Sequence, residues 1–235
     1  MTKELKKEYN ICMFRIVCIS DTHTLHDRIE VPEGDILLHA GDIMNSGYDS
    51  FDVFAFCNWY DSLPHKHKIF IAGNHDRFFE NYPDKIPGIL EKYPNILYLQ
   101  DKEVVVEGIK IYGSPWQPAF CSWAFNLSRG EELKKVWNKI PDDTDLLITH
   151  GPPFGILDKT IYTNENAGCE ELLPVVKKIK PILHLFGHIH EGYGVSVEND
   201  ITFVNASVCT LKYNPSNPAI VFDLDLETKT LIQVF

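Results

Sequence analysis

Five short apolar segments of this chain each end in polar residues of the kinds that bind metal ions. The segments span residues 14–20, 35–40, 68–72, 146–149 and 181–186, and they are rich in Ile, Leu and Val. Segments this short and this apolar are typical of buried β-strands. The polar residues that directly follow them are Asp21-Thr22-His23, Gly41-Asp42, Gly73-Asn74-His75, His150-Gly151 and Gly187-His188-Ile189-His190. The chain is therefore predicted to contain strands that lead into candidate metal ligands.

The positions of these polar groups predict a metal site. If the strands are neighbours in one sheet, their carboxyl ends lie at one edge, where open α/β sheets bind ligands. That edge would collect the side-chain oxygens of Asp21, Asp42 and Asn74 together with several imidazoles. A mixed set of oxygen and nitrogen ligands suits Mn, Fe or Zn rather than Ca or a thiolate-bound cluster. Any one of the polar groups is common by chance, whereas the ordered series is specific.

The ordered series resembles the signature of the calcineurin-like metallophosphoesterases. The blocks of that signature are Asp-x-His, Gly-Asp, Gly-Asn-His-Asp/Glu, His and Gly-His-x-His, and here they extend from Asp21 to His190. Stretches that contain no metal ligand, at residues 111–116 and 205–207, look like the MPPED-type branch, which is similar to class III cyclic nucleotide phosphodiesterases. Some animal members of that branch lack the first His of the last block, but this chain keeps His188.

Periodicity and turn chemistry predict the remaining elements. Helical spacing of apolar residues occurs over residues 51–63, 131–138 and 169–180. Two antiparallel hairpins are predicted, with turns at Glu107-Gly108 and at Asn199-Asp200. A last pair of strands is predicted over residues 219–224 and 230–235.

This order of elements predicts an α/β fold in which two packed sheets are flanked by helices. The resemblance implies the same architecture, a four-layer α/β/β/α metallophosphoesterase sandwich with two mixed β-sheets. Residues 1–12 read as a polar N-terminal lead-in, and residues 13–235 read as a single metallophosphoesterase domain. A chain of 235 residues is long enough to bury a substantial core without disulfides.

The resemblance also implies a role for each ligand. The first of two divalent ions would be held by Asp21, His23 and His190, and the second by Asn74, His150 and His188. Asp42 would bridge both ions, since two cations about 3.5–4 Å apart need a shared carboxylate. Mn is the expected metal, with Fe or Zn as alternatives. The implied reaction is in-line attack on phosphorus by a hydroxide that bridges the metals, so Asp42 counts as catalytic as well as a ligand.

In the family the residue at the position of His75 binds no metal and faces the leaving-group oxygen. There an imidazolium donates a proton or a hydrogen bond in the transition state. The resemblance therefore implies that His75 is catalytic. For Asp76 two interpretations stay open, because its carboxylate could orient the His75 ring or cap the following segment.

Substrate recognition is expected from loops. Residues 114–123 are dense in aromatic side chains and Pro, and Trp116 is a candidate for stacking on a nucleobase. The alternative is a rigid loop that buries its rings against the sheet. Tyr162 and Tyr193 are similar candidates for stacking, and Arg129 is a candidate phosphate anchor. Asn74 and His75 would contact the substrate from the metal side of the site.

Charge and cysteine content restrict the partners. The formal net charge of −11 disfavours nucleic acid, whereas a small anionic substrate at a dication site is compatible with it. No apolar run reaches the roughly 18 residues of a membrane span, and the charged N-terminal residues do not resemble a signal peptide. The six cysteines lack paired spacing, which predicts reduced thiols and a cytoplasmic protein. Protein partners are not predicted.

The function predicted is a binuclear metal-dependent phosphoesterase that hydrolyses small phosphodiesters or phosphomonoesters of nucleotide type. Protein Ser/Thr phosphatases carry Gly-Asp-x-x-Asp-Arg-Gly, whereas here Asn45 and Ser46 stand where their Asp and Arg would be. That difference argues against phosphoprotein substrates. A nuclease is disfavoured by the acidic balance. The alternative from another class is a catalytically weak nucleotide-binding or scaffolding protein on the same fold, as in the retromer complex.

Overall fold

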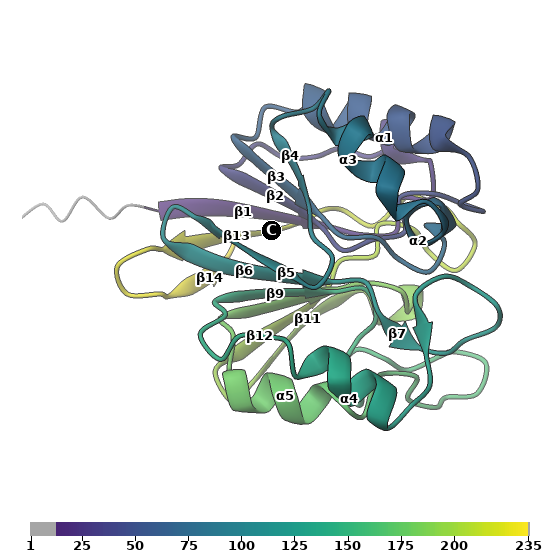
Figure 1. Ribbon diagram of the computed structural model, residues 1–235. Coiled ribbons are helices and arrows are strands. Elements are labelled where there is room, and N and C mark those ends of the chain that lie inside the picture. The colour runs from purple at the N-terminus through teal and green to yellow at the C-terminus, as the bar shows by residue number, and fades with distance from the viewer. Residues whose placement is uncertain (1–12, 235) are drawn as a thin grey trace, which may run out of the picture.

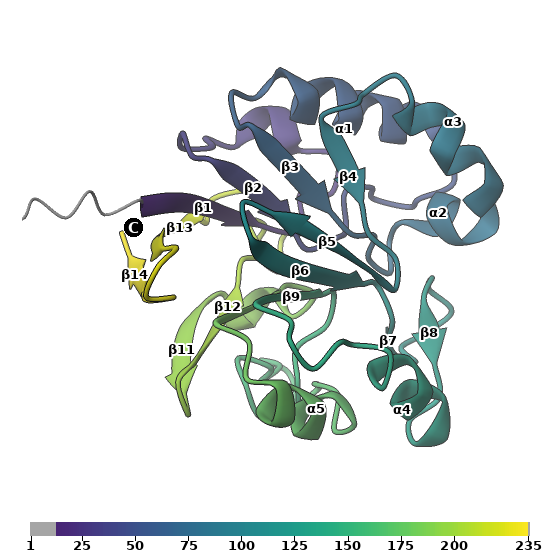
Figure 2. The ribbon, with the colours of Figure 1, turned by 60° about the vertical axis from the view of Figure 1, so that its left-hand side comes forward.

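Two six-stranded β-sheets lie face to face, and helices cover the outer face of each (Figures 1 and 2). The computed structural model describes residues 13–234. The outer helices on the first sheet are α1 (Ser50–Ser62), α2 (Arg77–Asn81) and α3 (Ile86–Leu90), and those on the second are α4 (Glu131–Trp137) and α5 (Leu172–Ile179). The predicted four-layer α/β/β/α architecture is confirmed. The predicted lead-in at residues 1–12 lies outside the described residues.

The first sheet has the strand order β14-β13-β1-β2-β3-β4. Its strands are β1 (Met13–Ile19), β2 (Ile36–His39), β3 (His67–Phe70), β4 (Ile96–Tyr98), β13 (Ile220–Asp225) and β14 (Leu231–Gln233). Strands β1 to β4 are parallel, and the C-terminal hairpin β13–β14 adds to β1 in antiparallel fashion. Chain segments from the two ends of the sequence are therefore neighbours in this sheet (Figure 1).

The second sheet has the order β11-β12-β10-β9-β6-β5. Its strands are β5 (Lys102–Val106), β6 (Ile109–Ser114), β9 (Leu146–Thr149), β10 (Leu183–Phe186), β11 (Gly194–Glu198) and β12 (Ile201–Asn205). Strands β6, β9, β10 and β12 are parallel, and both predicted hairpins add antiparallel edges. Their turn residues have positive φ, as two-residue hairpins require: Glu107, Gly108, Asn199 and Asp200.

The five strands that lead into candidate ligands do not share one sheet. Strands β1, β2 and β3 belong to the first sheet, and β9 and β10 to the second. The two sheets are linked where these strands end, because Val208 N donates to Ser20 O at 2.9 Å just past β12 and β1. The carboxyl ends of both parallel groups therefore meet at one edge of the sandwich.

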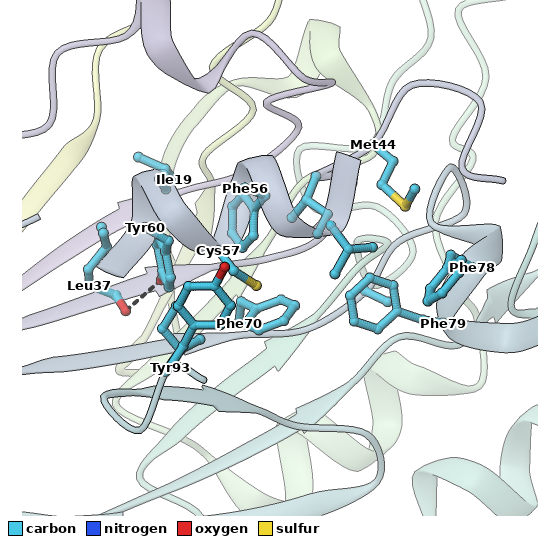
Figure 3. Close-up of a cluster of buried hydrophobic side chains, with 14 of the residues drawn as sticks. Ile19, Leu37, Met44, Phe56, Cys57, Tyr60, Phe70, Phe78, Phe79 and Tyr93 are labelled. Atoms are coloured by element: carbon cyan, nitrogen blue, oxygen red, sulfur yellow. Dashed lines mark hydrogen bonds between the residues drawn. The ribbon is translucent and has the colours of Figure 1, made fainter. Parts of the chain in front are cut away.

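Both faces of the central parallel strands β1, β2, β3, β9 and β10 are largely buried, which explains the continuous apolar runs in the sequence. In β1, Ile16 and Cys18 pack between the two sheets, whereas Val17 and Ile19 pack on the helix side. On that side the Tyr60 hydroxyl of α1 lies 2.9 Å from the carbonyl oxygen of Leu37, as Figure 3 shows within the aromatic cluster. Burial from both sides fixes the strand ends, and with them the loops that carry the site.

Three short helical segments and one short strand pair complete the fold. They are η1 (His26–Arg28), η2 (Pro83–Lys85), η3 (His190–Gly192), and the paired strands β7 (Gln117–Pro118) and β8 (Asn126–Leu127). Within residues 13–234, no helix combines the length and the apolar character that crossing a membrane requires.

Candidate active site

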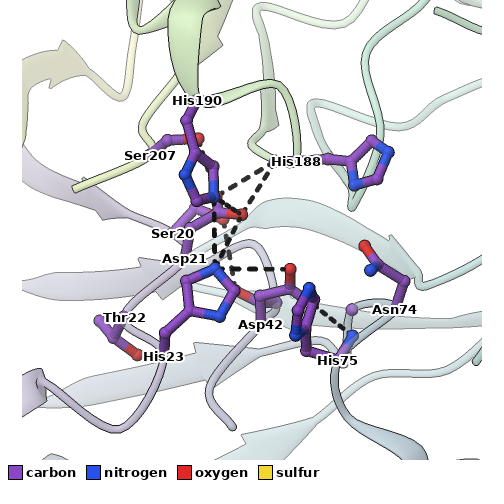
Figure 4. Close-up of polar contacts among 12 residues, drawn as sticks. Ser20, Asp21, Thr22, His23, Asp42, Asn74, His75, His188, His190 and Ser207 are labelled. Atoms are coloured by element: carbon purple, nitrogen blue, oxygen red, sulfur yellow. Dashed lines mark hydrogen bonds and ion pairs between the residues drawn. The ribbon is translucent and has the colours of Figure 1, made fainter. Parts of the chain in front are cut away.

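The structure brings all seven predicted metal ligands together at the shared edge of the two sheets, and Figure 4 labels all of them except His150. Each follows a strand: Asp21 and His23 follow β1, Asp42 follows β2, Asn74 follows β3, His150 follows β9, and His188 and His190 follow β10. Three groups each have ligand atoms within 4.8 Å of one another: Asp21, His23 and His190; His23, Asp42 and His75; Asp42, His150 and His188. Asn74 Oδ1 lies 2.8 Å from His150 Nε2 and so joins the last group.

Several of these ligands sit on backbone that L-residues rarely adopt. The φ angles are +55° at Asp21, +44° at His23, +57° at Asp42 and +68° at His188. Left-handed backbone at residues other than Gly costs on the order of 1–3 kcal/mol each and persists only where the surroundings enforce it. Here Asp21 N donates to the carbonyl of Gly41 at 2.9 Å, and His23 N donates to the carbonyl of Asp42 at 3.0 Å. The tight turns after β1 and β2 thus direct the side chains of Asp21, His23 and Asp42 into the same cluster.

The glycines of the motifs leave room for the carboxylates. A Cβ atom on Gly73 would lie 2.3 Å from Asp42 Oδ1, and one on Gly187 would lie 2.0 Å from Asp21 Oδ2. Both distances are far below van der Waals contact. The Gly that precedes Asn74 and the Gly that precedes His188 are therefore required by the packing of the two carboxylates.

Backbone carbonyl groups orient three of the imidazoles. The contacts are His23 Nδ1 to Met44 O at 3.1 Å, His150 Nδ1 to Ala40 O at 2.9 Å, and His190 Nδ1 to Thr210 O at 3.1 Å. A carbonyl only accepts hydrogen bonds, so Nδ1 carries the proton in each ring and Nε2 faces the cluster. Metal-binding histidines are commonly oriented in this way.

Positive charge stabilises the buried carboxylates of the cluster. Burial opposes ionisation of Asp21, but the hydrogen bond and ion pair with His190 at 3.3 Å hold its pKa well below the usual range. Burial likewise opposes the charge on His190, yet Asp21 raises its pKa to about 9. His150, 3.4 Å from Asp42 Oδ2, also has its pKa raised to about 9 by that carboxylate against the effect of burial.

Two protonated rings therefore neutralise two buried carboxylates. Divalent cations bound to the same nitrogens and oxygens would supply that charge instead and release the protons. The donor set of carboxylate, amide and imidazole groups suits Mn, Fe or Zn. The residues present thus fit a site for divalent metal.

The side chains of Ser207 and Asn205 and the backbone amide of His188 hold the Asp21 side of the cluster. Ser207 Oγ donates to Asp21 Oδ2 at 2.8 Å, and the amide of His188 donates to Asp21 Oδ1 at 3.1 Å (Figure 4). Asn205 Nδ2 donates to Ile189 O at 2.8 Å and fixes the loop between the two histidines. Residues 205–207 pointed to a branch of the family in the sequence, but the supporting roles of Asn205 and Ser207 were not predicted.

His75 lies beside the cluster on the turn that follows β3. Its backbone amide donates to Asp42 Oδ1 at 2.8 Å, and its Nδ1 is hydrogen-bonded to Asn45 O. Asp76 neither orients the His75 ring nor caps α2, so both interpretations offered for it are wrong. Its buried carboxylate instead accepts hydrogen bonds from Met44 N at 2.8 Å and Gly73 N at 2.7 Å. Burial, together with the charge on Asp42, raises the pKa of Asp76 to about 8.

A cavity of about 540 Å³ opens above the cluster. Asn74, His75 and Arg129 line it, and their contact with substrate stays a prediction. The Arg129 guanidinium is held by the carbonyl oxygens of Gly168 at 3.0 Å and Ala167 at 3.3 Å. The predicted phosphate anchor thus reaches the cavity wall, although part of its hydrogen-bonding capacity is used within the protein.

Trp116 and Tyr193 do not belong to the described residues that line the cavity. The Trp116 ring packs edge-on against Phe125, with centroids 5.4 Å apart, and its Nε1 donates to Asp101 at 3.1 Å. The Tyr193 hydroxyl donates to Pro218 O at 2.9 Å. For Trp116 the structure matches the alternative in which the loop buries its rings.

Other aromatic and aliphatic side chains form the mouth of the cavity. Phe120, Tyr162, Leu211 and Tyr213 line it and are exposed. Tyr213 is also near the ligands, with its ring centroid 4.7 Å from that of His23. Tyr162 was a candidate from the sequence, and Phe120 lies in the predicted aromatic loop. Leu211 and Tyr213 were missed, because they follow the last ligand in a loop that carries no motif.

Comparison with known proteins agrees with this geometry. The family model of the calcineurin-like phosphoesterases matches residues 14–192. Human metallophosphoesterase domain-containing protein 1 is 47% identical over an alignment that covers 89% of this chain and 71% of the human protein. A UPF0046 protein of Caenorhabditis elegans is 40% identical, with 90% of this chain and 81% of the worm protein covered.

A solved structure, that of TT1561 from Thermus thermophilus, superimposes on this chain with a TM-score of 0.60. The match covers 94% of this chain and 98% of that one at 16% identity, so it shows a shared fold. The family match, by contrast, extends over every candidate ligand from Asp21 to His190 and over His75. The chain belongs to the calcineurin-like phosphoesterase family, whose members are phosphoric ester hydrolases that generally bind divalent metals.

Proposed function

We propose that this protein is a binuclear metal-dependent phosphoesterase that hydrolyses small, nucleotide-like phosphodiesters or phosphomonoesters. The observation that carries the proposal is the position of Asp42. Its carboxylate belongs to one group of ligand atoms with His23 and His75 and to another with His150 and His188. His23 belongs in turn to the group that contains Asp21 and His190, so Asp42 lies between the two proposed ligand sets. A carboxylate shared by two ligand groups is what a pair of neighbouring cations requires.

The roles of the residues follow from their positions. Asp21, His23 and His190 would hold one ion, Asn74, His150 and His188 the other, and Asp42 both. Mn is the metal that we propose, with Fe or Zn also compatible with the ligands. Bound ions would polarise the phosphoryl oxygens and acidify a water between them. His75, at the cavity wall beside Asp42, would donate a proton or a hydrogen bond to the leaving-group oxygen.

Cavity size and lining support a substrate with an aromatic or sugar-like part. A volume of about 540 Å³ lies within the range of small-molecule sites. Phe120 and Tyr162 at its mouth supply rings on which a base could stack, and we assign them the stacking role that the sequence suggested for Trp116. Arg129, which also lines the cavity, would contact anionic oxygens of the substrate.

A cytoplasmic site of action is part of the proposal. The five cysteines within residues 13–234 form no disulfide, which fits a reducing compartment. The net charge of −11 fits a small anionic substrate drawn in by metal charge rather than a nucleic acid. We propose that the reaction involves no membrane, and we assign no protein partner.

The test combines metal analysis with an activity screen. Purified protein is loaded with Mn, and bound metal per chain is measured after removal of the excess. Catalytic efficiency is then compared on a cyclic nucleotide, an aryl phosphodiester and a phosphopeptide. We expect about two ions per chain and hydrolysis of both small esters, with the nucleotide preferred.

Each part of the proposal can fail separately. A stoichiometry that stays near one despite excess Mn would remove the two-metal mechanism. Preference for the phosphopeptide would overturn the substrate class. Two bound ions without turnover of any ester would favour the alternative of a binding or scaffolding protein on this fold.

A further inference from the structure

A loop from the second half of the chain is attached to the turn that carries His75. This loop, residues 119–125, runs between β7 and β8. Ala124 N donates to the carbonyl of Asn74 at 3.0 Å, and Phe125 N donates to Glu80 of α2 at 2.8 Å. The turn after β3 belongs to the first sheet, so the attachment joins the two halves of the sandwich at the cavity.

Within this loop Trp123 stacks on the imidazole of His75. The ring centroids are 4.0 Å apart, and the ring planes are inclined by only 26°. Among the described residues, the imidazole makes one hydrogen bond, from Nδ1 to Asn45 O. A single hydrogen bond does not fix the plane of the ring. The His23 ring meets the imidazole edge-on, with centroids 4.7 Å apart, and the indole face of Trp123 packs flat against it.

Contacts with Arg77 hold Trp123 in place. The guanidinium carbon of Arg77 lies 5.1 Å from the Trp123 ring centroid and 5.2 Å from that of Tyr48, distances at which cation–π attraction is effective. Arg77 also donates a hydrogen bond to the carbonyl of Ser122. Tyr48, Arg77 and Trp123 thus form a support behind His75.

We propose that Trp123 is a positioning residue for His75, and this inference rests on the proposed function. The stacked indole holds the imidazole in the orientation in which Nδ1 stays on Asn45 O and Nε2 remains available at the cavity wall. Trp123 is absent from the described residues that line the cavity, so stacking on substrate does not explain its position.

The proton transfer that depends on this orientation is simple. As the bond between phosphorus and the leaving oxygen breaks, its electron pair stays on that oxygen. The Nε2–H group of His75 donates its proton to that oxygen, and a proton from solvent replaces it after the product leaves. Protonation matters most for a poor leaving group, because a good one departs as an anion without help.

Leaving-group dependence therefore tests the role. Aryl phosphodiesters with good and poor leaving groups are compared for wild type, Trp123→Ala, Trp123→Phe, His75→Ala and the double variant Trp123→Ala/His75→Ala. Ser122→Ala is the matched control, since it changes the neighbouring side chain and keeps the carbonyl that Arg77 contacts. Thermal melting of each variant reports whether the fold is retained.

We expect Trp123→Ala to lower kcat about 10- to 100-fold on the poor leaving group, a part of the ~10²–10⁴-fold that general acid catalysis provides. The good leaving group should be affected much less, and Trp123→Phe should restore most of the loss. The double variant should be no slower than His75→Ala. An equal loss on all esters, or additive losses in the double variant, would overturn the proposal.

A second readout does not depend on activity. In the stacked arrangement the indole shields the carbon-bound ring protons of His75, so their NMR signals should lie upfield in wild-type protein. They should move downfield in Trp123→Ala and stay in place in Ser122→Ala. If they do not respond to Trp123→Ala, Trp123 does not hold the ring. If they respond while wild-type protein hydrolyses no ester, the proposed function fails and the stacking stands.

Discussion

The cluster of predicted metal ligands beneath the cavity, here called the floor, consists mainly of buried side chains, whereas the mouth of the cavity is made of exposed side chains on loops. Asp21 and His150 are 0% exposed and Asp42 is 2% exposed, while Phe120 is 56% and Tyr162 is 87% exposed. The floor residues are tied to the backbone: Asp21 accepts from His188 N, and Asp42 accepts from His75 N. Tyr162 lies in the loop between β9 and α5, in contact with solvent.

This difference separates two tasks. Buried carboxylates with several hydrogen bonds hold their geometry whether or not a substrate is present, as preorganised ligands for cations must. Exposed rings on loops contribute little to folding, so they can differ between proteins that share one chemistry. We therefore expect floor substitutions to change metal binding and rate for every substrate, and substitutions at the mouth to change which ester is preferred.

The largest effect is expected from Asp42→Asn. The amide keeps the shape of the side chain but removes the negative charge that two cations would share. Bound metal should fall below two ions per chain. The rate should fall by at least ~10³-fold on every ester, because a metal ion contributes several kcal/mol to the transition state. Metal analysis and steady-state kinetics measure both.

Asp84→Asn serves as the matched control for this substitution, because Asp84 is an exposed carboxylate in η2. It should bind metal and turn over substrate like wild type. If Asp42→Asn still binds two ions with unchanged affinity, Asp42 is not the bridge, and the proposed sharing of its carboxylate by two ions is wrong.

The sequence predicted that the floor residues lie together and missed much of the mouth, and the reason is physical, whereas the roles assigned to the floor residues stay predictions. Asp42 and His188 lie in short motifs at strand ends, where a burial pattern and a fixed order of residues restrict their position. Trp116 and Tyr213 lie in loops, where side-chain direction depends on contacts distant in sequence. The Trp116 side chain points toward Asp101, and its Nε1 donates a hydrogen bond to that carboxylate. The sequence contains no periodic signal for this contact.

Asp76 shows that contacts distant in sequence limit prediction even for a residue inside a motif. Its position after His75 suggested two local roles, orienting the neighbouring ring or capping the next helix. Its actual partners include the amides of Ile43 and Met44, more than 30 residues earlier in the chain. Pairing of β2 with β3 brings the loops that follow them together, and this pairing could be predicted only as a general arrangement of strands, not as individual hydrogen bonds.

An intermediate effect is expected from Ser207→Ala, which tests whether supporting residues matter at the floor. The substitution removes the hydroxyl that donates to Asp21 Oδ2 and leaves a buried charged oxygen with one donor fewer. Loss of such a supporting contact typically weakens metal affinity ~10–100-fold. Isothermal titration with Mn measures the change, and Ser216→Ala, at an exposed serine, is the control. Equal affinities in the two variants would show that the backbone alone orients Asp21.

The smallest effect is expected at the mouth, from Tyr162→Ala. Stacking of a base on an aromatic ring is worth ~1–3 kcal/mol, and a side chain that is 87% exposed should provide the lower part of that range. We expect catalytic efficiency on a cyclic nucleotide to fall up to about tenfold through a higher KM, with little change for a small alkyl phosphodiester. Because the side chain packs little, the free energy of unfolding should change by less than ~0.5 kcal/mol. Val197→Ala, at a residue 68% exposed on β11, controls for removing an exposed apolar side chain and should leave both substrates unaffected. If Tyr162→Ala instead lowers kcat equally on both esters, Tyr162 acts on the metal centre or on His75, and the separation between floor and mouth fails.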